Sequence, residues 1–452
     1  MSAAEKIRKI AEKKYDLGLI VDMEAKRNIQ AYRPDHFVEP PIVLERGEGV
    51  FVWDINGRRY LDFSAQFSAC NIGHGNSEMI EAIVKQLKAN QTNISPAYIT
   101  KSRVMLAEVM AELTEGKLSR SWFGATGSDA VEAALKFARK CTRRYKFVSL
   151  WRGYHGATLG ALSAHGIWET RNDYGPLLTD FAHVSPPYCY RCDFNLEYPD
   201  CDLTCLRVLE KTVEREGPEH VAGVIMEPIP AGGGVIVPPD RYLPELRKVC
   251  DRQDVLLILD EVVTGFGRTG RIFCYQHYDI VPDLLVLGKG ITSGYIPGSA
   301  VLASGKLDVY DPKNPRESLH WHTHCANPLA CAAAIASANI LLRENLPENA
   351  MKVGEFFLKG LLDLKEESKV LGDARGKGLL HGLEIVEDKG SKRPSFPKME
   401  KIARECMKNG LIVETCGGTD IAVVVFHPPL TVTEEHAEKA LEILRKAVQL
   451  AK

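Results

Sequence analysis

Residues 255–262 read VLLILDEV, and residues 283–291 read DLLVLGKGI. Both stretches contain a continuous apolar run rather than the alternation expected of a strand with one solvated face. Such runs are typical of parallel strands that helices cover on both faces. Each run is followed by a residue with useful chemistry, Asp260 in the first and Lys289 in the second. We therefore predict two buried strands whose ends carry a carboxylate and an amine.

The same pattern extends along most of the chain. Apolar runs at 146–150 and 221–226 predict further buried strands, and 121–123 predicts a short one. Residues 129–140 (DAVEAALKFARK) carry apolar residues at helical spacing. Strands and helices alternate in this way from about residue 73 to residue 298. This alternation predicts an α/β fold with a mostly parallel sheet covered by helices.

The two ends of the chain have a different pattern. Residues 1–30 look helical, the proline-rich segment 32–44 looks extended, and residues 49–62 (GVFVWDINGRRYLD) predict a hairpin. The C-terminal part predicts helices at 328–342, 350–364, 398–408 and from Thr433 onward, and strands at 379–385 and 421–426. We expect an N-terminal segment (1–65) that belongs to a small domain, a large domain (66–328) and a C-terminal small α+β domain (329–452).

The composition argues against several classes of protein. The 452 residues carry a formal net charge of −2, so no nucleic-acid partner is expected. No run approaches the roughly 18 apolar residues that span a bilayer, and no membrane association is expected. Residues 1–22 mix acidic and basic residues without the apolar core of a signal peptide. We expect a cytoplasmic protein.

Four predicted strands end at polar residues. These residues are Glu227, Asp260, Lys289 and the pair Tyr154-His155. In open α/β sheets, ligands bind at the carboxyl ends of the strands. One polar strand end is unremarkable, whereas four together predict a single site.

Residues 124–128 (GATGS) lie between a predicted strand and a predicted helix. Small residues let the backbone approach a ligand, and the helix N-terminus favours an anion, so this segment is a candidate phosphate cradle. A tight turn with no ligand is the alternative. Two other glycine motifs are rejected. Residues 265–270 (GFGRTG) lack the amphipathic helix of a dinucleotide fold, and residues 288–292 lack the first glycine of a P-loop.

An ordered set of motifs resembles one family. The motifs are LDFSAQFSACNIGHG (61–75), GSDAVEAALKFAR (127–139), YHG (154–156), MEP (226–228), LILDEVVTGFGRTG (257–270), LLVLGKGI (284–291), HTHCANPLACAA (322–333), RGKGL (375–379) and HPPL (427–430). In this order they resemble the class III aminotransferases, from about Gly49 to the C-terminus. The resemblance implies pyridoxal phosphate (PLP) as cofactor and PLP fold type I, with a mostly parallel seven-stranded sheet in the large domain.

The resemblance also implies a role for each strand end. Lys289 would form the Schiff base with the cofactor and then shuttle the substrate proton, which a lowered pKa would favour. Asp260 would pair with the pyridinium nitrogen and keep the ring an electron sink. Tyr154 and Val262 would lie against opposite faces of the ring.

Other residues would hold the cofactor's periphery. Gly127 and Ser128 would bind the phosphate, and Thr323 would reach it from a neighbouring subunit. Glu227 and His155 would support Asp260 and the ring. An active site shared in this way implies a homodimer or a tetramer, and the motifs leave that choice open.

Three departures bear on the substrate. The branches that act on γ-aminobutyrate and ornithine carry a carboxylate-binding arginine after YHG, a glutamate five residues after that of MEP, and an arginine three residues before the proline pair. This chain has Ala157, Gly232 and Val425 at these positions. A missing arginine removes a bidentate anchor for a carboxylate. The pattern is closer to transaminases that take ω-amines or ω-amino acids and use a keto acid such as pyruvate as acceptor.

The substrate pocket is less defined. Phe67 and Tyr154 are expected to line it, and Arg375 is a candidate for the acceptor carboxylate, although a structural role in the small domain is favoured. A racemase or epimerase on the same fold remains an alternative. A non-enzymatic PLP-binding relative is disfavoured because Lys289 and Asp260 are both present.

Four of the twelve cysteines form a cluster, Cys189, Cys192, Cys201 and Cys205. Their spacing is compatible with zinc, with disulfides in a hyperthermophile, and with reduced thiols. We expect a local staple away from catalysis and assign no metal to the catalytic site.

Overall fold

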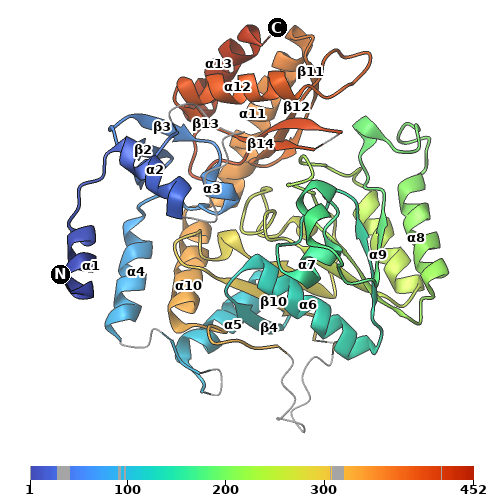
Figure 1. The fold of residues 1–452 in the computed structure, drawn as a ribbon. Helices are drawn as coiled ribbons and strands as arrows, with labels where there is room; N and C mark the ends of the chain where they lie inside the picture. Colours follow the sequence, from blue (N-terminus) through green and yellow to red (C-terminus); the bar gives the residue numbers. More distant parts are fainter. Residues whose placement is uncertain are drawn as a thin grey trace.

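A computed structural model describes residues 2–27, 41–89, 93–95, 98–305, 307, 320–418 and 420–451. A large domain with a central sheet carries a smaller domain built mainly from the C-terminal part of the chain (Figure 1). The N-terminal helices α1 (Ala3–Ala11) and α2 (Leu17–Arg27) lie at one side of the molecule. Of the extended segment predicted at 32–44, residues 32–40 lie outside the described residues.

The large domain contains a seven-stranded sheet, and this confirms the predicted fold class. The strand order is β4-β10-β9-β8-β7-β5-β6. All neighbours from β9 to β6 are parallel, whereas β10 runs antiparallel to both β9 and β4. The strands span Arg120–Gly124 (β4), Lys146–Leu150 (β5), Phe181–Val184 (β6), Val221–Met226 (β7), Leu256–Asp260 (β8), Leu284–Leu287 (β9) and Ser299–Ala303 (β10).

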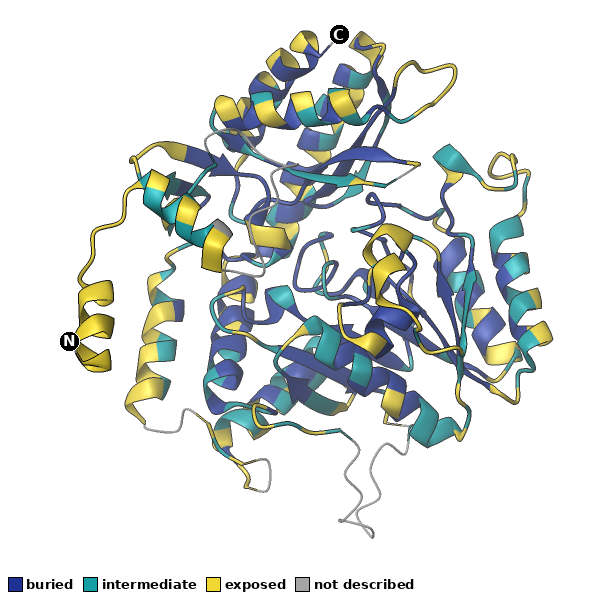
Figure 2. Cartoon of the chain, viewed as in Figure 1, coloured by how far each residue is buried: buried dark blue, intermediate teal, exposed yellow. Residues whose placement is uncertain are grey.

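Helices bury both faces of this sheet, which explains the continuous apolar runs. Ile258 of β8 packs in one apolar cluster with α6 (Gly127–Thr142) and α7 (Leu159–Ala164). Leu257 and Leu259 point the other way, into the cluster that contains α8 (Thr204–Glu216) and α9 (Tyr242–Arg252). The strands are therefore largely buried (Figure 2). A rigid, doubly covered sheet fixes where its strand ends point.

The small domain has its own sheet, in the order β11-β12-β15-β14. Three long helices accompany these strands, α11 (Leu346–Glu367), α12 (Phe396–Lys408) and α13 (Glu434–Leu450). The strands span Leu371–Lys377 (β11), Leu380–Ile385 (β12), Glu414–Gly417 (β14) and Ala422–Phe426 (β15). The strand β14 lies at the edge of the sheet, toward the large domain (Figure 1).

The N-terminal hairpin joins the C-terminal part of the chain. The predicted hairpin forms from β2 (Phe51–Asp54) and β3 (Arg59–Asp62), and β1 (Leu44–Glu48) pairs with β2. The short strand β13 (Leu411–Ile412) pairs in parallel with β3. A segment before residue 65 and a segment after residue 410 therefore share one sheet.

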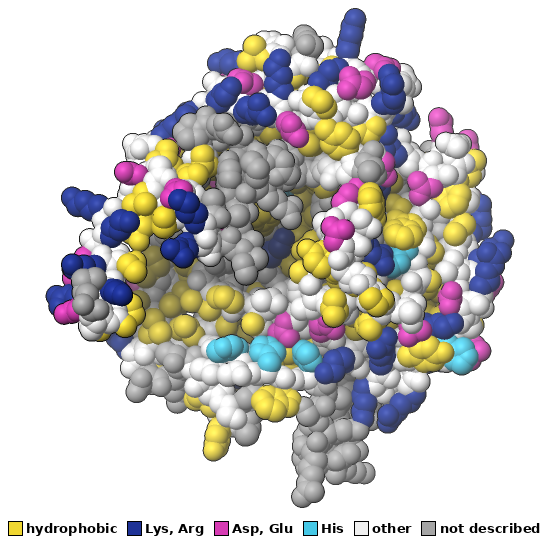
Figure 3. Space-filling model, in the orientation of Figure 1, with side chains coloured by type: hydrophobic (Ala, Val, Ile, Leu, Met, Phe, Trp, Pro, Cys, Tyr) yellow, Lys and Arg dark blue, Asp and Glu magenta, His cyan; other side chains and the backbone are white. Residues whose placement is uncertain are grey.

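Two further features complete the fold. In the part of the chain that the structure describes, no single helix is long and apolar enough to cross a membrane, although α10 (Pro328–Arg343) and α11 pass that test together as a bent pair. Acidic and basic side chains are interspersed on the face drawn in Figure 3. This mixture fits the small net charge.

Candidate active site

The sheet order brings the predicted site residues together at the carboxyl ends of the parallel strands. The strand β8 lies between β7 and β9, and β5 is the next neighbour of β7. Because these four strands are parallel, their carboxyl ends meet at the same side of the sheet. Asp260 closes β8, Glu227 directly follows β7, and Lys289 follows β9 by two residues.

Asp260 is held by a histidine and by its own turn. Its Oδ2 lies 2.8 Å from Nδ1 of His155, and its Oδ1 accepts the N–H of Val262 at 3.1 Å. Both side chains of the Asp260–His155 pair are buried, with exposed fractions of 3% and 0%. A buried carboxylate with fixed partners can hold a cationic ring nitrogen in one place.

Glu227 anchors the segment that carries Tyr154. Its two carboxylate oxygens accept the N–H of Tyr154 at 2.8 Å and the N–H of Ala231 at 3.1 Å. Burial, followed by the nearby charge of Asp260, raises the pKa of Glu227 to about 7. The tyrosine ring stays half exposed, and it meets His165 edge to face with ring centroids 4.6 Å apart.

Lys289 has the environment of a reactive amine. Burial lowers its pKa below the ordinary value of 10.5. Three carboxylates, led by Glu414, act in the opposite direction. No hydrogen bond or ion pair engages its amine among the residues placed in the structure. An uncommitted lysine of lowered pKa is suited to act as a nucleophile and as a base.

The segment 124–128 opens α6 as the cradle hypothesis requires. Thr126 caps the helix by accepting the N–H of Asp129 at 3.2 Å, and Ser128 Oγ accepts the N–H of Ala157 at 3.1 Å. A Cβ at Gly127 would lie 3.1 Å from both methyl carbons of Val262. Val262 also lies within 3.3 Å of a Cβ built at Gly288, so it packs between the helix start and the lysine turn.

The small domain contributes a carboxylate that the sequence motifs did not reveal. Glu414, the first residue of β14, accepts the N–H of Phe67 at 3.1 Å through Oε1, and its Oε2 lies 3.1 Å from Nε2 of His427. Phe67 itself is exposed and has φ +62°, a left-handed conformation it shares with residues 65, 66 and 68. Such strain in a run of non-glycine residues is typical of functional sites. Only the pairing of distant segments reveals Glu414, because no local motif surrounds it.

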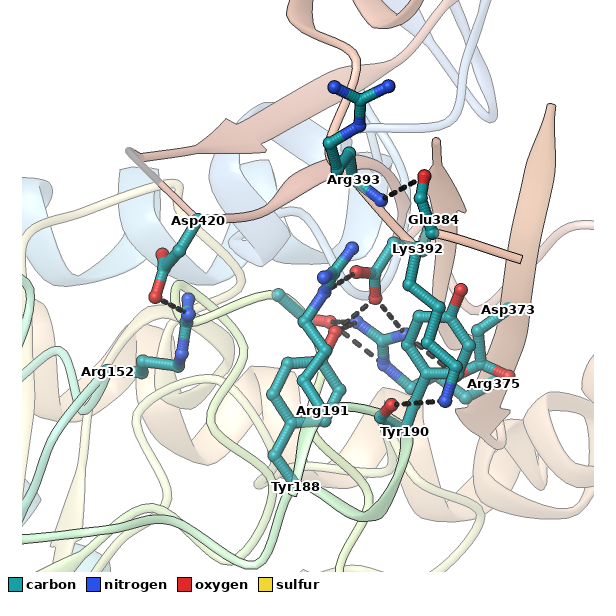
Figure 4. Close-up of polar contacts among 12 residues, drawn as sticks. Arg152, Tyr188, Tyr190, Arg191, Asp373, Arg375, Glu384, Lys392, Arg393 and Asp420 are labelled. Atoms are coloured by element: carbon teal, nitrogen blue, oxygen red, sulfur yellow. Dashed lines mark hydrogen bonds and ion pairs between the residues drawn. The ribbon is translucent and has the colours of Figure 1, made fainter. Parts of the chain in front are cut away.

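Arg375 is fully committed to structure (Figure 4). Its guanidinium donates to the carbonyl of Val235 at 2.9 Å, to Asp373 and Glu384 at 2.8 Å each, and to the hydroxyl of Tyr188 at 2.8 Å. Its side chain is 10% exposed. These contacts fit the structural role that the sequence favoured and leave its guanidinium few donors for a substrate carboxylate.

Thr323 lies on an exposed turn. Two histidines of the same segment bind the first turn of α6, because His320 and His322 lie 3.0 and 2.7 Å from the two oxygens of Asp129. The predicted role of Thr323 in a neighbouring subunit stays a prediction.

The four clustered cysteines line one small cavity beside Tyr188. All four are free thiols, and burial raises the pKa of Cys205 to about 12. Within the described ranges, no group of three or more histidine, cysteine or acidic residues is arranged to hold a metal ion.

A reactive lysine, a buried carboxylate and a helix N-terminus at one sheet edge define a site for a phosphate-bearing cofactor held through its carbonyl group. The comparisons with known proteins agree. The family model "Aminotransferase class-III" matches residues 32–448. The chain therefore belongs to the class III aminotransferases, whose cofactor is pyridoxal phosphate.

Three relatives illustrate the range of the family. The chain is 38% identical over 424 residues to the uncharacterized aminotransferase YhxA of Bacillus subtilis (strain 168), covering 90% of this chain and 92% of the relative. It is 34% identical over 411 residues to the leucine/methionine racemase of Thermococcus litoralis, covering 90% of each. A PLP-bound amine transaminase from an uncultivated Pseudomonas species matches with a TM-score of 0.88 and 34% identity, over 94% of this chain and 99% of that chain.

The residues around Lys289 fit this cofactor. The amine has no hydrogen-bond or ion-pair partner among the described residues, and Asp260 ends the neighbouring strand. A Cβ at Gly156 would lie 2.4 Å from Ser128 Oγ, so only glycine allows the loop to lie against the start of α6. The Nε2 atom of His155 is buried without a hydrogen-bond partner among the residues in view. Gly127, Ser128, Tyr154 and Val262 would enclose the group, and Asp260 and Lys289 would hold it at two points.

Proposed function

We propose that this aminotransferase moves an amino group from an ω-amine or ω-amino acid to a keto acid such as pyruvate. The observation that carries the proposal is the loss of three charged positions, now Ala157, Gly232 and Val425. A Cβ at Gly232 would lie 3.1 Å from the Cβ of Tyr154, so a larger side chain there would crowd the tyrosine. An α-amino dicarboxylate or ornithine would find no matching anchor at these positions.

The residues of the chain have separable tasks in this reaction. Bound pyridoxal phosphate supplies an electron sink for the carbon that loses its proton. Lys289 would carry that proton, and the lowering of its pKa by burial favours the neutral amine that a base requires. Asp260, oriented by His155, would keep the ring nitrogen protonated. Tyr154, which is half exposed, would lie against the cofactor ring and also contact the substrate.

The assembly belongs to the same proposal. We propose a homodimer or a tetramer in which Thr323 of the partner subunit completes the phosphate site. The exposed position of Thr323 on its own subunit supports this proposal. A racemase is the second candidate, because the Thermococcus litoralis relative carries that name at 34% identity.

A half-reaction screen tests the proposal. Single amines and amino acids are added to the PLP-loaded enzyme without a keto acid, and the visible absorbance is recorded. We expect ω-amines to remove the absorbance of the lysine-bound cofactor and pyruvate to restore it. Lys289→Ala should abolish both changes, with a loss of roughly 10⁴-fold in rate. Loss of optical rotation from an α-amino acid without transfer of its amine would instead identify a racemase.

A further inference from the structure

The strand pair β14–β15 places the carboxylate of Glu414 beside the candidate active site. Glu414 is the direct cross-strand partner of Val425. Directly opposed residues of an antiparallel pair project from the same face of the sheet. Glu414 and Val425 therefore share the face that turns toward Phe67 and Lys289.

The carboxylate of Glu414 is oriented but not saturated. One oxygen accepts the N–H of Phe67, and the other contacts His427, which in turn lies 2.5 Å from the carbonyl oxygen of Ser64. Each carboxylate oxygen can accept about two hydrogen bonds, so acceptor capacity remains on both. The side chain of Glu414 is 23% exposed, whereas that of His427 is 5% exposed. The histidine is thus the more buried partner of the pair, and the partly exposed carboxylate keeps acceptor capacity for a further donor.

The charged groups that act on Lys289 are mostly negative. Of the charged groups that act most strongly on the pKa of Lys289, three are carboxylates (Glu414, Glu227 and Asp260) and one is a cation, Arg268. Arg268 is fully buried, and its guanidinium binds Asn71 and two backbone carbonyls.

Two further cations beside the β14–β15 hairpin, among the residues that the structure describes, are also committed. Arg152 pairs with Asp420 at the tip of the hairpin, and Arg375 binds Asp373 and Glu384. Asp260 is claimed by the cofactor in the proposed function, and the pKa of Glu227 is raised. Of the three described carboxylates that act on Lys289, Glu414 is therefore the one left to face a substrate.

We infer that Glu414 recognises a second cationic group on the amino donor, so that the enzyme prefers diamines over neutral amines and ω-amino acids. This inference rests on the proposed transaminase function and narrows its donor class. An ammonium group at the far end of the donor would form a charge-assisted hydrogen bond with the accessible oxygen of Glu414. The same negative charge would oppose a second carboxylate at that place.

The test compares matched donors and one isosteric variant. Wild type and Glu414→Gln are assayed with 1,5-diaminopentane and pentylamine, with pyruvate as acceptor. The amide keeps an acceptor for Phe67 N–H and loses the charge. We expect wild type to favour the diamine by roughly tenfold in kcat/KM, as a partly exposed charge-assisted contact allows, and Glu414→Gln to lose this preference.

The acceptor supplies a readout that damage to the fold would not give. Removal of a negative charge should leave kcat/KM for pyruvate unchanged or raise it, while kcat/KM for the diamine falls. Glu405→Gln removes a different carboxylate of the small domain, one that pairs with Lys408, and should change neither value. An unchanged diamine preference in Glu414→Gln, or an equal fall for both amines and pyruvate, would overturn the inference and assign Glu414 to fastening the loop of Phe67.

A series in the wild-type enzyme makes the result independent of any variant. 1,5-Diaminopentane, 5-aminopentanol and 5-aminopentanoate are all five-carbon amines whose far group is cationic, neutral and anionic in turn, and we expect activity to fall in that order. A flat series would contradict the role of Glu414 while leaving the transaminase proposal intact. If none of these amines changes the absorbance of the loaded enzyme, the proposed function fails, and the inference about Glu414 fails with it.

Discussion

Two carboxylate–histidine pairs place a carboxylate near Lys289, and they differ in their surroundings. Asp260 and His155 belong to the large domain and are almost fully buried, whereas Glu414 and His427 belong to the small domain and leave the carboxylate 23% exposed. Asp260 ends a central strand of the seven-stranded sheet, and Glu414 begins an edge strand. A doubly covered central strand gives a fixed position, which suits a cofactor that stays bound. An edge strand beside an exposed loop suits a contact that must form and break with each substrate.

Of the two pairs, the buried one gives the larger expected effect. Asp260→Asn keeps the shape of the side chain and removes the charge that would hold the ring nitrogen protonated. We expect kcat/KM to fall by roughly 10³-fold, by a similar factor for diamines and for neutral amines. Steady-state assays with 1,5-diaminopentane and pentylamine measure this ratio. A loss confined to one class of donor would contradict the assignment of Asp260 to the cofactor and of Glu414 to the substrate.

The substitution Arg375→Lys tests whether this arginine of the small domain stabilises the fold or binds the substrate. Lysine cannot replace the fork of donors that binds Val235, Asp373 and Glu384, so Arg375→Lys leaves buried acceptors unpaired. We expect the free energy of unfolding to fall by about 3 kcal/mol in urea titrations, because breaking a buried ionic network is costly. KM for pyruvate should stay the same. Arg393→Lys, on the exposed loop nearby, is the matched control and should be neutral.

A raised KM for pyruvate together with unchanged stability in Arg375→Lys would contradict the structural role. It would return Arg375 to the substrate-binding role that the sequence left open.

The difference between the two regions also explains what the sequence could predict. The strands β5, β7, β8 and β9 are buried on both faces, so their composition alone marks them, and the chemistry of Asp260 and Lys289 lies directly at their ends. Neighbouring parallel strands then bring these ends together without further information.

The substrate side carries no such local signal. The strand β11 (LGDARGK) resembles a loop because it contains glycine and charged residues, and it forms because its arginine and aspartate have partners in the fold. The strand β14 (ETCG) is short and polar. Glu414 reaches Phe67 across 347 residues of sequence, and its pairing with Val425 follows only from the register of β14 and β15. The strand β10 was not predicted either, because its short apolar segment (SAVLA) does not by itself distinguish a strand from a buried piece of helix.

The smallest expected effect concerns Glu227, which lies on the cofactor side and shares its burial. Its pKa is raised from 4.5 to about 7 in the folded protein, so between these values the folded state holds a proton that the unfolded chain has lost. The stability contributed by this group is therefore fully present below pH 4.5 and is lost as the pH rises through about 7, and about 2 kcal/mol of it is lost between pH 5 and pH 7. Chemical denaturation of the cofactor-free enzyme at pH 5 and pH 7 should show that Glu227→Gln gains stability relative to wild type as the pH rises. Glu261, whose pKa is also raised to about 7 by burial, lowers the free energy of unfolding of wild type and variant alike as the pH rises. A difference between wild type and Glu227→Gln that stays constant with pH would mean that Glu227 is already ionised at pH 5, and that the buried region tolerates a second full charge beside Asp260.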